Sequence, residues 1–385
     1  MEGNQLYQLH MPTKVYFGRK IWKEALRKEA ALLHGTVMLV TTGRSLSRLG
    51  YVKELEKEIQ RYQNGKKVIT YDAISANPRL TEVQRGIEIG KAEKVEIVVG
   101  FGGGSALDAA KAIAVGIAEK EEIKEFFDSG REPEHTLPVI AIPTTAGTGS
   151  ELSKAAILTD EVQKRKNGIR GKVMYPVIAV VDSFFTESVP QQITMETGFD
   201  VLAHAMESYV SRAASPYTQM LSRQAIELVG RWLPYLLEYP KDERARERMS
   251  FASMIMGTNL GNASTCLPHR MQYPLGAHTD TSHGAGLAAL FPAWIGCESM
   301  YESDKIESML LLLTGKEWTG SEACVKAIKD WERCLGLPIS LQELGVEKRS
   351  LRVYADEVTG KLENDPASDR RDVVWSLYKE AWQEE

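Results

Sequence analysis

The chain has 385 residues and is 43% hydrophobic, which leaves room for two domains and a large core. Its formal net charge of −5, and the lack of a long basic run interleaved with aromatic residues, argue against a nucleic-acid partner. The chain has only four cysteines, a first segment (Met1 to Gln5) without the apolar core of a signal peptide, and no run of about 20 apolar residues. These features predict a reduced, cytoplasmic protein without a membrane span.

Short β-branched and apolar runs alternate with helical stretches in the first half of the chain. They predict strands at 36–41, 68–71, 95–101, 138–142 and 177–182. This alternation is typical of a doubly wound, mostly parallel α/β sheet. After Pro190 the strand signal disappears, and helical periodicity predicts helices at 215–239, 243–261 and 371–382. We therefore predict an α/β domain over residues 1–188 and an all-helical domain over residues 189–385.

A glycine loop follows the strand expected at 95–101. Gly102-Gly103-Gly104-Ser105 leads directly into a helical stretch from Ala106. Strand, glycine turn and helix together aim backbone N–H groups at an anion, and glycine lets a diphosphate approach the backbone. The alternative is a tight turn with a capping box made by Ser105 and Asp108. Both can hold at once, since a capped helix still has free N–H groups.

A second polar loop follows the strand expected at 138–142. It reads Pro143-Thr-Thr-Ala-Gly-Thr-Gly-Ser150-Glu151, with seven consecutive small residues, three of them threonine. Such residues at the carboxyl end of a strand lie where open α/β sheets bind ligands. An ordinary polar loop is the alternative, but it would not need this many small hydroxyl residues in a row.

Histidines and one aspartate predict a metal site in the second half. Asp200 and His204 are four residues apart and share one face of a helix, and His269 and His283 can complete the set. One carboxylate and three imidazoles suit iron(II) or zinc, and such an ion acts as a Lewis acid on a carbonyl or alcohol oxygen. The first pair could instead be a plain helix-surface pair. His278, in an expected loop, competes with His283, but a His-Gly pair that opens a helix favours His283.

Four motifs, in this order, resemble the iron-containing (group III) alcohol dehydrogenases. They are Gly102 to Ser105 with Asp108 and Lys111, then Ile142 to Glu151, then Thr197-Gly-Phe-Asp200-x-x-x-His204-Ala-x-Glu207, and then His269 with His283-Gly284. The likeness covers nearly the whole chain. It implies the dehydroquinate synthase-like fold of that family, with a dinucleotide-binding domain, a helical metal-binding domain and the metal in the cleft between them. It also implies NAD or NADP, Fe2+ or Zn2+, a small aldehyde or alcohol as substrate, and a homodimer.

The resemblance also assigns roles residue by residue. The metal ligands would be Asp200, His204, His269 and His283. The cofactor diphosphate would lie on Gly102, Gly103, Gly104 and Ser105. Other cofactor contacts would come from Thr42, Asn77, Asp108, Thr144, Thr145, Thr148 and Lys166. The register of Lys166 is ambiguous, because Lys164 and Arg165 are adjacent.

Three positions depart from the family pattern. Ala106 replaces a frequent proline, which is harmless at the first turn of a helix. Tyr273 stands where many members have another histidine, so it would take over a catalytic role there or that role is dispensable. The segment Val40 to Ser45 has no carboxylate for a ribose 2′-hydroxyl, and Arg44 could meet a 2′-phosphate, which favours NADP. A solvated charge at a helix start is the alternative for Arg44.

The resulting functional prediction is an NAD(P)-linked alcohol dehydrogenase or aldehyde reductase that transfers hydride between nicotinamide and a short-chain aldehyde. Arg270 and His278 are predicted to bind substrate, which would suit an anionic tail, as in sulfoacetaldehyde or phosphonoacetaldehyde. The alternatives are a cyclising lyase similar to dehydroquinate synthase, a hydroxyacid–oxoacid transhydrogenase, and a non-catalytic binding protein. Cys266 could add a ligand, although buried packing is favoured.

Overall fold

The computed structural model describes residues 6–63 and 65–382, so the prediction drawn from Met1 to Gln5 lies outside the described residues. The chain forms two compact units. The sheet unit comprises Thr13–Thr194 and Tyr239–Met254, and the helical unit comprises Met1–Pro12, Met195–Glu238 and Ile255–Glu385. Both units are built from separated segments of the chain, so they do not test the predicted division into residues 1–188 and 189–385, which stays a prediction.

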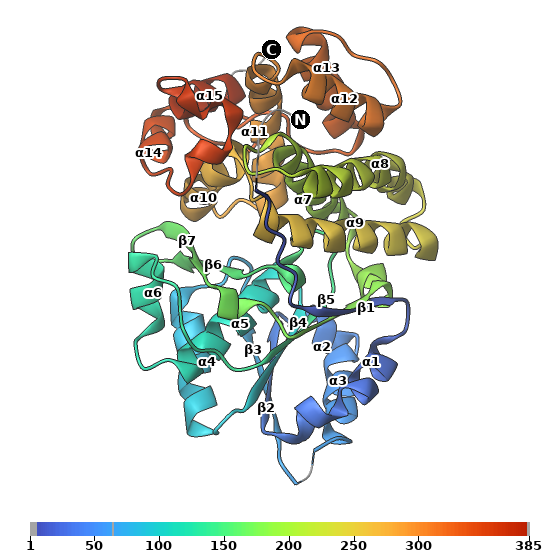
Figure 1. Cartoon of the computed structure of the whole chain (residues 1–385), viewed down its shortest axis with the longest axis vertical. Coiled ribbons are helices and arrows are strands. Elements are labelled where there is room, and N and C mark those ends of the chain that lie inside the picture. The colour runs from blue at the N-terminus through green and yellow to red at the C-terminus, as the bar shows by residue number, and fades with distance from the viewer. Residues whose placement is uncertain (1–5, 64, 383–385) are drawn as a thin grey trace. The chain divides into compact units, whose positions relative to one another are not determined.

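A six-stranded, wholly parallel sheet forms the centre of the sheet unit (Figure 1). Its order is β1-β8-β5-β4-β2-β3, with the bounds β1 Lys14–Gly18, β2 Val37–Thr42, β3 Val68–Ile74, β4 Ile97–Gly102, β5 Val139–Pro143 and β8 Ile178–Asp182. The five predicted strands and the doubly wound fold class are confirmed. β1 was not predicted, because it is an edge strand whose side chains are exposed or half-buried and lack an apolar run.

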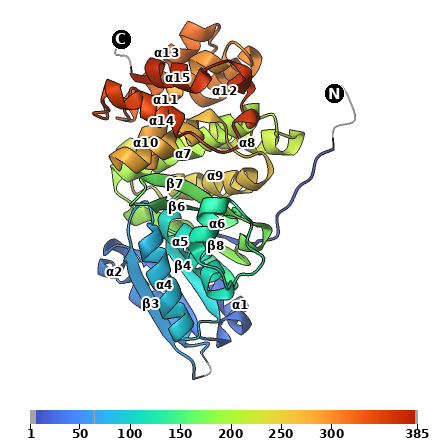
Figure 2. The ribbon, with the colours of Figure 1, turned by 90° about the vertical axis from the view of Figure 1, so that its left-hand side faces the viewer.

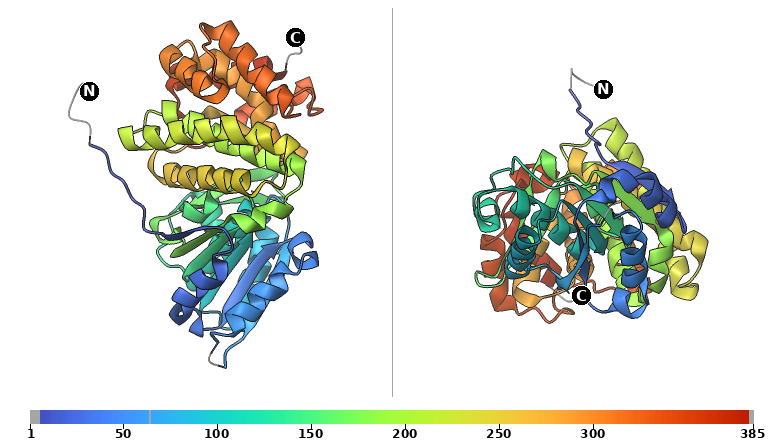
Figure 3. Two further views of the ribbon diagram at one scale, coloured as in Figure 1. Left: turned by 90° about the vertical axis from the view of Figure 1, so that its right-hand side faces the viewer. Right: turned by 90° about the horizontal axis from the view of Figure 1, so that it is seen from below.

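Alternate side chains of each strand enter different cores. In β2, Val37 and Leu39 pack toward α1 (Trp22–Lys28), α2 (Ser45–Arg48) and α3 (Tyr51–Gln60). Met38 and Val40 pack toward α4 (Leu80–Ala92), α5 (Gly104–Ala118) and α6 (Ile123–Ser129). Figure 2 shows α4 and α6 in front of the sheet, and the left view of Figure 3 shows the blue N-terminal helices on its other face. Because both faces are covered, the inner strands β4, β5 and β8 are buried along their whole length.

An antiparallel hairpin, β6 (Ala155–Asp160) and β7 (Arg165–Arg170), was not predicted. Its second strand contains several charged and polar residues, and the turn places Lys164 at a φ of 51°. Short 3-10 helices complete the connections: Ala30–His34, Ser150–Leu152, Lys172–Met174, Ser183–Ser188, Lys348–Ser350, Leu362–Asn364 and Pro366–Asp369.

After β8, the described residues form helices joined by loops and contain no further strand, as predicted. The helices are α7 Gln191–Val210, α8 Pro216–Glu238, α9 Glu243–Asn262, α10 Leu267–Thr279, α11 His283–Glu298, α12 Ser303–Thr314, α13 Ser321–Cys334, α14 Leu351–Asp356 and α15 Val373–Trp382. The placement of His278 in a loop was wrong: it lies in the last turn of α10, whose C-cap residue, Asp280, has a φ of 55°. Within residues 6–63 and 65–382, no helix has the length and apolar character needed to cross a bilayer.

Candidate cofactor loops and metal centre

The strand order creates a ligand position at the carboxyl edge of the sheet. From β2 the chain moves to β3 on one side, and then to β4 on the other side of β2. The loops after β2 and β4 therefore diverge, which opens the crevice where doubly wound sheets bind nucleotides. Thr42 ends β2, Gly102 ends β4 and Pro143 ends β5, so the predicted cofactor loops leave the sheet at one edge.

Gly102 lies against the end of β2. Its φ is +155°, a conformation that favours glycine. A Cβ there would lie 2.7 Å from the Cβ of Ala106 and 3.3 Å from Oγ1 of Thr42. Glycine at this position thus lets the loop pass close to both neighbours, and it brings Thr42 to the same place as the glycine loop.

Gly103 and Gly104 lie against the second polar loop, Pro143 to Glu151, which we call the threonine loop. A Cβ at Gly103 would lie 3.2 Å from Oγ1 of Thr145, and one at Gly104 would lie 2.5 Å from Cγ2 of Thr148. In addition, the backbone N–H of Thr144 donates to the carbonyl of Gly102 over 2.9 Å. The two predicted loops therefore form one small-residue surface whose backbone a diphosphate can approach.

The capping-box interpretation of Ser105 and Asp108 is wrong. Helix α5 begins at Gly104, and its N-cap, Gly103, has no side-chain cap. The first N–H groups of α5 are therefore not satisfied by a capping side chain, as an anion site at a helix N-terminus requires. Ser105 is the second residue of α5 and lies in its first turn.

The carboxylate of Asp108 instead accepts hydrogen bonds from the end of the threonine loop and from β6. Its Oδ1 accepts a hydrogen bond from Ser150 Oγ over 2.5 Å, and its Oδ2 accepts one from the N–H of Ile157 over 2.9 Å. Nζ of the buried Lys111 lies 3.0 Å from Oδ1 and donates to Ser150 Oγ over 2.7 Å. Both carboxylate oxygens of Asp108 therefore have partners within the protein, and its contact with the cofactor stays a prediction.

The three adjacent basic residues of the hairpin differ in burial. Lys166 is buried, and its Nζ donates to Oδ1 of Asn77 over 2.9 Å. Lys164 is exposed in the turn, and Arg165 pairs with Asp128. The structure thus brings Asn77 and Lys166 together, as expected for two residues assigned to one cofactor.

The four predicted metal ligands come together in the helical unit. Asp200 and His204 lie on α7, His269 on α10, and His283 is the first residue of α11. Oδ1 of Asp200 lies 3.4 Å from Nε2 of His269, 3.6 Å from Nε2 of His283 and 3.7 Å from Nδ1 of His204. The ligand atoms of Asp200, His269 and His283 all lie within 4.8 Å of one another. The ring of His204 stacks on that of His269, with centroids 4.4 Å apart.

The buried atoms of this set fit a cation. Oδ1 of Asp200 and Nε2 of His269 are buried without a hydrogen-bond partner among the described residues. Burial would raise the pKa of Asp200, yet the surrounding imidazoles hold it below its usual range. Burial would lower the pKa of His269, yet the carboxylates of Glu207 and Asp200 raise it to about 10. The site therefore attracts positive charge, which a divalent ion would supply.

Two further residues orient the imidazoles. Nδ1 of His269 lies 2.6 Å from Oε1 of the buried Glu207, and Nδ1 of His283 lies 2.6 Å from Oε1 of Gln272. A carboxylate or amide oxygen accepts a hydrogen bond from the Nδ1–H group, which keeps the proton on Nδ1 and leaves the lone pair of Nε2 for a metal. Neither of these roles was predicted from the sequence. Glu207 belongs to the motif from Thr197 to Glu207, but the contact of Gln272 depends on the packing of α10 against α11.

Gly284 explains why a His-Gly pair opens α11. A Cβ at this position would clash with the backbone carbonyl of Glu196 on α7. Glycine therefore lets the first turn of α11, which carries His283, approach α7, which carries Asp200 and His204. The glycine that follows His283 in the sequence thus has a steric cause.

The other predicted residues on α10 are arranged differently. Nε2 of His278 lies 2.7 Å from Oε2 of Glu357, outside the four-residue set. The guanidinium of Arg270 lies 5.9 Å from the ring centroid of Tyr273. Cys266 is buried, its Sγ donates to the carbonyl of Glu207, and burial raises the pKa of the thiol. Packing therefore accounts for Cys266.

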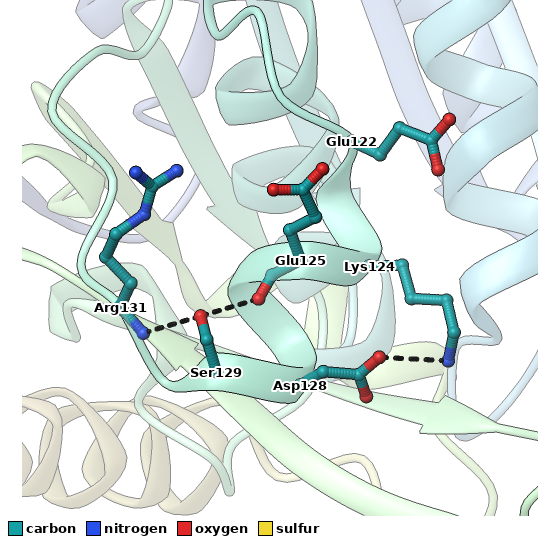
Figure 4. Close-up of a pocket in the computed structure, with 6 residues that line it drawn as sticks. All are labelled: Glu122, Lys124, Glu125, Asp128, Ser129 and Arg131. Carbon is teal, nitrogen blue, oxygen red and sulfur yellow. Dashed lines mark hydrogen bonds and ion pairs between the residues drawn. The ribbon is translucent and has the colours of Figure 1, made fainter.

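A groove of about 620 Å³ lies over α6 and its flanking turns (Figure 4). Its lining contains none of the predicted site residues: Glu122, Lys124, Glu125, Asp128, Ser129 and Arg131. Most of its charges are already neutralised, for example by the pair of Lys124 and Asp128, whose atoms are 3.3 Å apart.

Known proteins match the chain along its length. The family described as "Iron-containing alcohol dehydrogenase" matches residues 12–183, and "Fe-containing alcohol dehydrogenase family, C-terminal" matches residues 194–382. Sulfoacetaldehyde reductase of Bilophila wadsworthia is 29% identical over 374 residues, which cover 94% of this chain and 96% of that protein. Alcohol dehydrogenase 4 of Saccharomyces cerevisiae is 31% identical over 322 residues, 83% of each chain.

Solved structures agree with this relationship. The structure of sulfoacetaldehyde reductase from Bifidobacterium kashiwanohense in complex with NAD+ has a TM-score of 0.86 and 28% sequence identity, and it covers 98% of this chain and 99% of that one. The chain therefore belongs to the iron-containing alcohol dehydrogenase family and is a metal-dependent, NAD-linked oxidoreductase of alcohols and aldehydes.

Proposed function

We propose that this enzyme reduces a short aldehyde with an anionic tail, such as a sulfonate or phosphonate, and that Arg270 binds that tail. The proposal rests on one observation: the Arg270 side chain is buried and has no counterion among the described residues. The residue is only 6% exposed, and its Nη2 donates to Ser264 Oγ over 3.3 Å. Its Nε has no hydrogen-bond partner, and no ion pair forms between it and the described residues.

A buried cation without a counterion is costly, and a planar guanidinium binds sulfonate, phosphonate or carboxylate oxygens with two parallel hydrogen bonds. Arg270 directly follows the proposed ligand His269 in α10, so an anion bound there would be held beside the metal-binding helix. His278 has Glu357 as its partner, so Arg270 alone carries this part of the proposal. The two relatives named sulfoacetaldehyde reductase support the same substrate class.

The roles of the remaining residues follow from their positions. A divalent ion held by Asp200, His204, His269 and His283 would act as a Lewis acid on the substrate carbonyl and offset the charge that develops during hydride transfer. Glu207 and Gln272 keep two of the imidazole rings in the orientation needed to hold the ion. The glycine and threonine loops would bind the cofactor diphosphate with backbone N–H groups, which fixes the nicotinamide relative to the sheet.

We further propose that the enzyme prefers NADPH. The segment from Gly43 to Gly50, after β2, contains no carboxylate but contains Arg44 and Arg48. Arg44 is exposed at the N-cap of α2, at the switch point of the sheet, where it can meet a 2′-phosphate. Replacing Arg44 by Ala should raise the KM for NADPH about tenfold and leave the KM for NADH within a factor of two, consistent with the loss of one charge-assisted contact of about 1.4 kcal/mol.

The proposed biological setting is a cytoplasmic homodimer with Fe2+ as resident metal and Zn2+ as an alternative. β1 pairs with β8 on one side and has no partner strand on its other side among the described residues, so a second copy can extend the sheet there. Sedimentation of the purified enzyme tests the dimer, and metal analysis of enzyme purified without added metal tests the identity of the ion.

The decisive experiment compares initial rates with an anionic aldehyde and a neutral aldehyde of the same size. We expect the Arg270→Met variant to lose about 100-fold in kcat/KM for the anionic aldehyde, since about 2–3 kcal/mol of charge-assisted hydrogen bonding is removed. Its rate with the neutral aldehyde should stay within threefold. Arg223→Met, at an exposed position on α8, is the matched control and should change neither rate.

Three results would contradict the proposal in different ways. Equal rates of the native enzyme on both aldehydes would remove the anionic substrate. An equal loss on both aldehydes in Arg270→Met would make Arg270 structural. If no aldehyde led to oxidation of NADH or NADPH, the cyclising lyase or, when the cofactor stays bound through turnover, the transhydrogenase would be favoured.

A further inference from the structure

We propose that Asp365, in the C-terminal part of the chain, is a positioning residue of the metal site: it holds the N-terminus of α10 and thereby places His269. The inference rests on the metal site proposed above. Asp365 lies 96 residues after His269 in the chain, and no role was predicted for it from the sequence.

The N-terminus of α10 has no cap of its own. Its N-cap residue, Cys266, makes no side-chain cap hydrogen bond, and His269 is the third residue of the helix. The first N–H groups of a helix have no intrahelical acceptor and need one from elsewhere. Two buried carboxylates supply it: Oε2 of Glu207 accepts from the N–H of Cys266 over 2.7 Å, and Oδ2 of Asp365 accepts from the N–H of Leu267 over 3.0 Å.

Asp365 also binds the helix that carries the last ligand. Its Oδ2 accepts a hydrogen bond from Nε1 of Trp294 on α11 over 3.0 Å, and its Oδ1 accepts one from the N–H of Ala367 over 2.9 Å. The side chain is 0% exposed, so all of its contacts are within the protein. One carboxylate thus joins the start of α10, with His269, to the middle of α11, whose first residue is His283.

The same segment holds the end of α7. The N–H of Arg212, two residues after α7, donates to the carbonyl of Asn364 over 2.8 Å, and its Nη2 donates to the carbonyl of Pro366 over 3.0 Å. We call Asn364–Ala367 the C-terminal clamp. It contacts α10, α11 and Arg212, which follows α7 by two residues, so it is linked to all three helices that bear proposed ligands.

This arrangement has a functional consequence. Metal ligands must be held to within about 0.5 Å of the required geometry, and that precision comes from the groups behind them. A charged acceptor at a helix N-terminus is stronger than a neutral one, because it is charge-assisted and lies at the positive end of the helix dipole. Removing it would let the first turn of α10 shift, and His269 would shift with it.

The test uses full-length protein and measures metal binding directly. Metal-free enzyme is titrated with Co2+, and the dissociation constant and the ligand-field absorption spectrum are recorded. We expect Asp365→Asn, which keeps one acceptor oxygen, to weaken Co2+ binding about 10-fold, and Asp365→Ala to weaken it up to about 100-fold, with a changed spectrum. Asp365→Asn keeps the test valid if Asp365→Ala does not fold.

Two matched variants separate positioning from general stability. Asp369→Asn changes an exposed aspartate in the next turn that pairs with Arg212, and it should leave Co2+ affinity within threefold. Leu310→Ala removes a fully buried side chain from α12, so it should lower the melting temperature without changing Co2+ affinity or the spectrum.

The outcomes are distinguishable. If native protein binds Co2+ tightly and Asp365→Ala binds it equally well with an unchanged spectrum, Asp365 is only structural and the inference is overturned. If native protein and Asp200→Ala bind Co2+ with the same weak affinity, the metal site itself is refuted. Neither result depends on aldehyde turnover, so the substrate proposal is judged separately.

Discussion

Glu332 on α13 has a buried carboxyl group without hydrogen-bond partners, so replacing it should change the stability of the protein in a predictable direction. The residue is 0% exposed, and neither carboxyl oxygen has a hydrogen-bond partner among the described residues. Burial raises the pKa of this carboxyl well above its usual range. The folded protein therefore keeps Glu332 protonated under conditions in which the unfolded chain ionises it.

We predict that Glu332→Met stabilises the protein. A buried polar group without partners costs about 1–3 kcal/mol, and methionine, a flexible side chain of similar length, removes that cost and adds apolar burial. The sign of the pH effect follows from the raised pKa. In the native protein the contribution of Glu332 is most favourable below the unfolded pKa of about 4.5 and is lost as pH rises toward the folded pKa.

The stabilising effect of Glu332→Met should therefore grow with pH, by about 1.4 kcal/mol per pH unit between about 4.5 and the raised pKa of the folded state. Urea unfolding followed by circular dichroism at pH 5, 6 and 7 measures it. Glu227→Met, in the middle of α8 at an exposed position, is the control and should change stability by less than about 0.5 kcal/mol at each pH. A destabilised Glu332→Met, or a gain that is the same at pH 5 and pH 7, would refute the reasoning.

Three further predictions concern the loops and the metal. Gly104→Ala should weaken NADPH binding at least tenfold, measured by cofactor fluorescence, because its Cβ would lie 2.5 Å from Cγ2 of Thr148; unchanged affinity would remove the glycine loop from the cofactor site. Lys111→Met should cost about 3–5 kcal/mol in urea unfolding, because it leaves the carboxylate of Asp108 without its buried cation. A near-neutral effect would show that water reaches this position. Asp200→Ala should retain no divalent metal after dialysis and should lose at least 1,000-fold in kcat; native metal content in this variant would exclude Asp200 as a ligand.

Local patterns were sufficient for much of the fold. Five strands of the parallel sheet and the helices at 215–239, 243–261 and 371–382 follow from runs and periodicities that depend only on which side chains are buried. The glycine and threonine loops were located for the same reason, since the end of a strand and the start of a helix are local events. β1 and the hairpin β6–β7 were missed, because an edge strand and a polar hairpin carry no apolar signal.

The sequence by itself also determined the identity of the proposed ligands, since one carboxylate and three histidines with recognisable spacings are visible without a fold. Only the tertiary structure decided what surrounds them. Glu207 reaches His269 across 62 residues, and Asp365 reaches Leu267 across 98. Asp108 accepts a hydrogen bond from Ser150 in the threonine loop, and His278 pairs with Glu357. Such partners are chosen by the packing of helices far apart along the chain, and a hydrogen bond between them leaves no periodicity in the sequence.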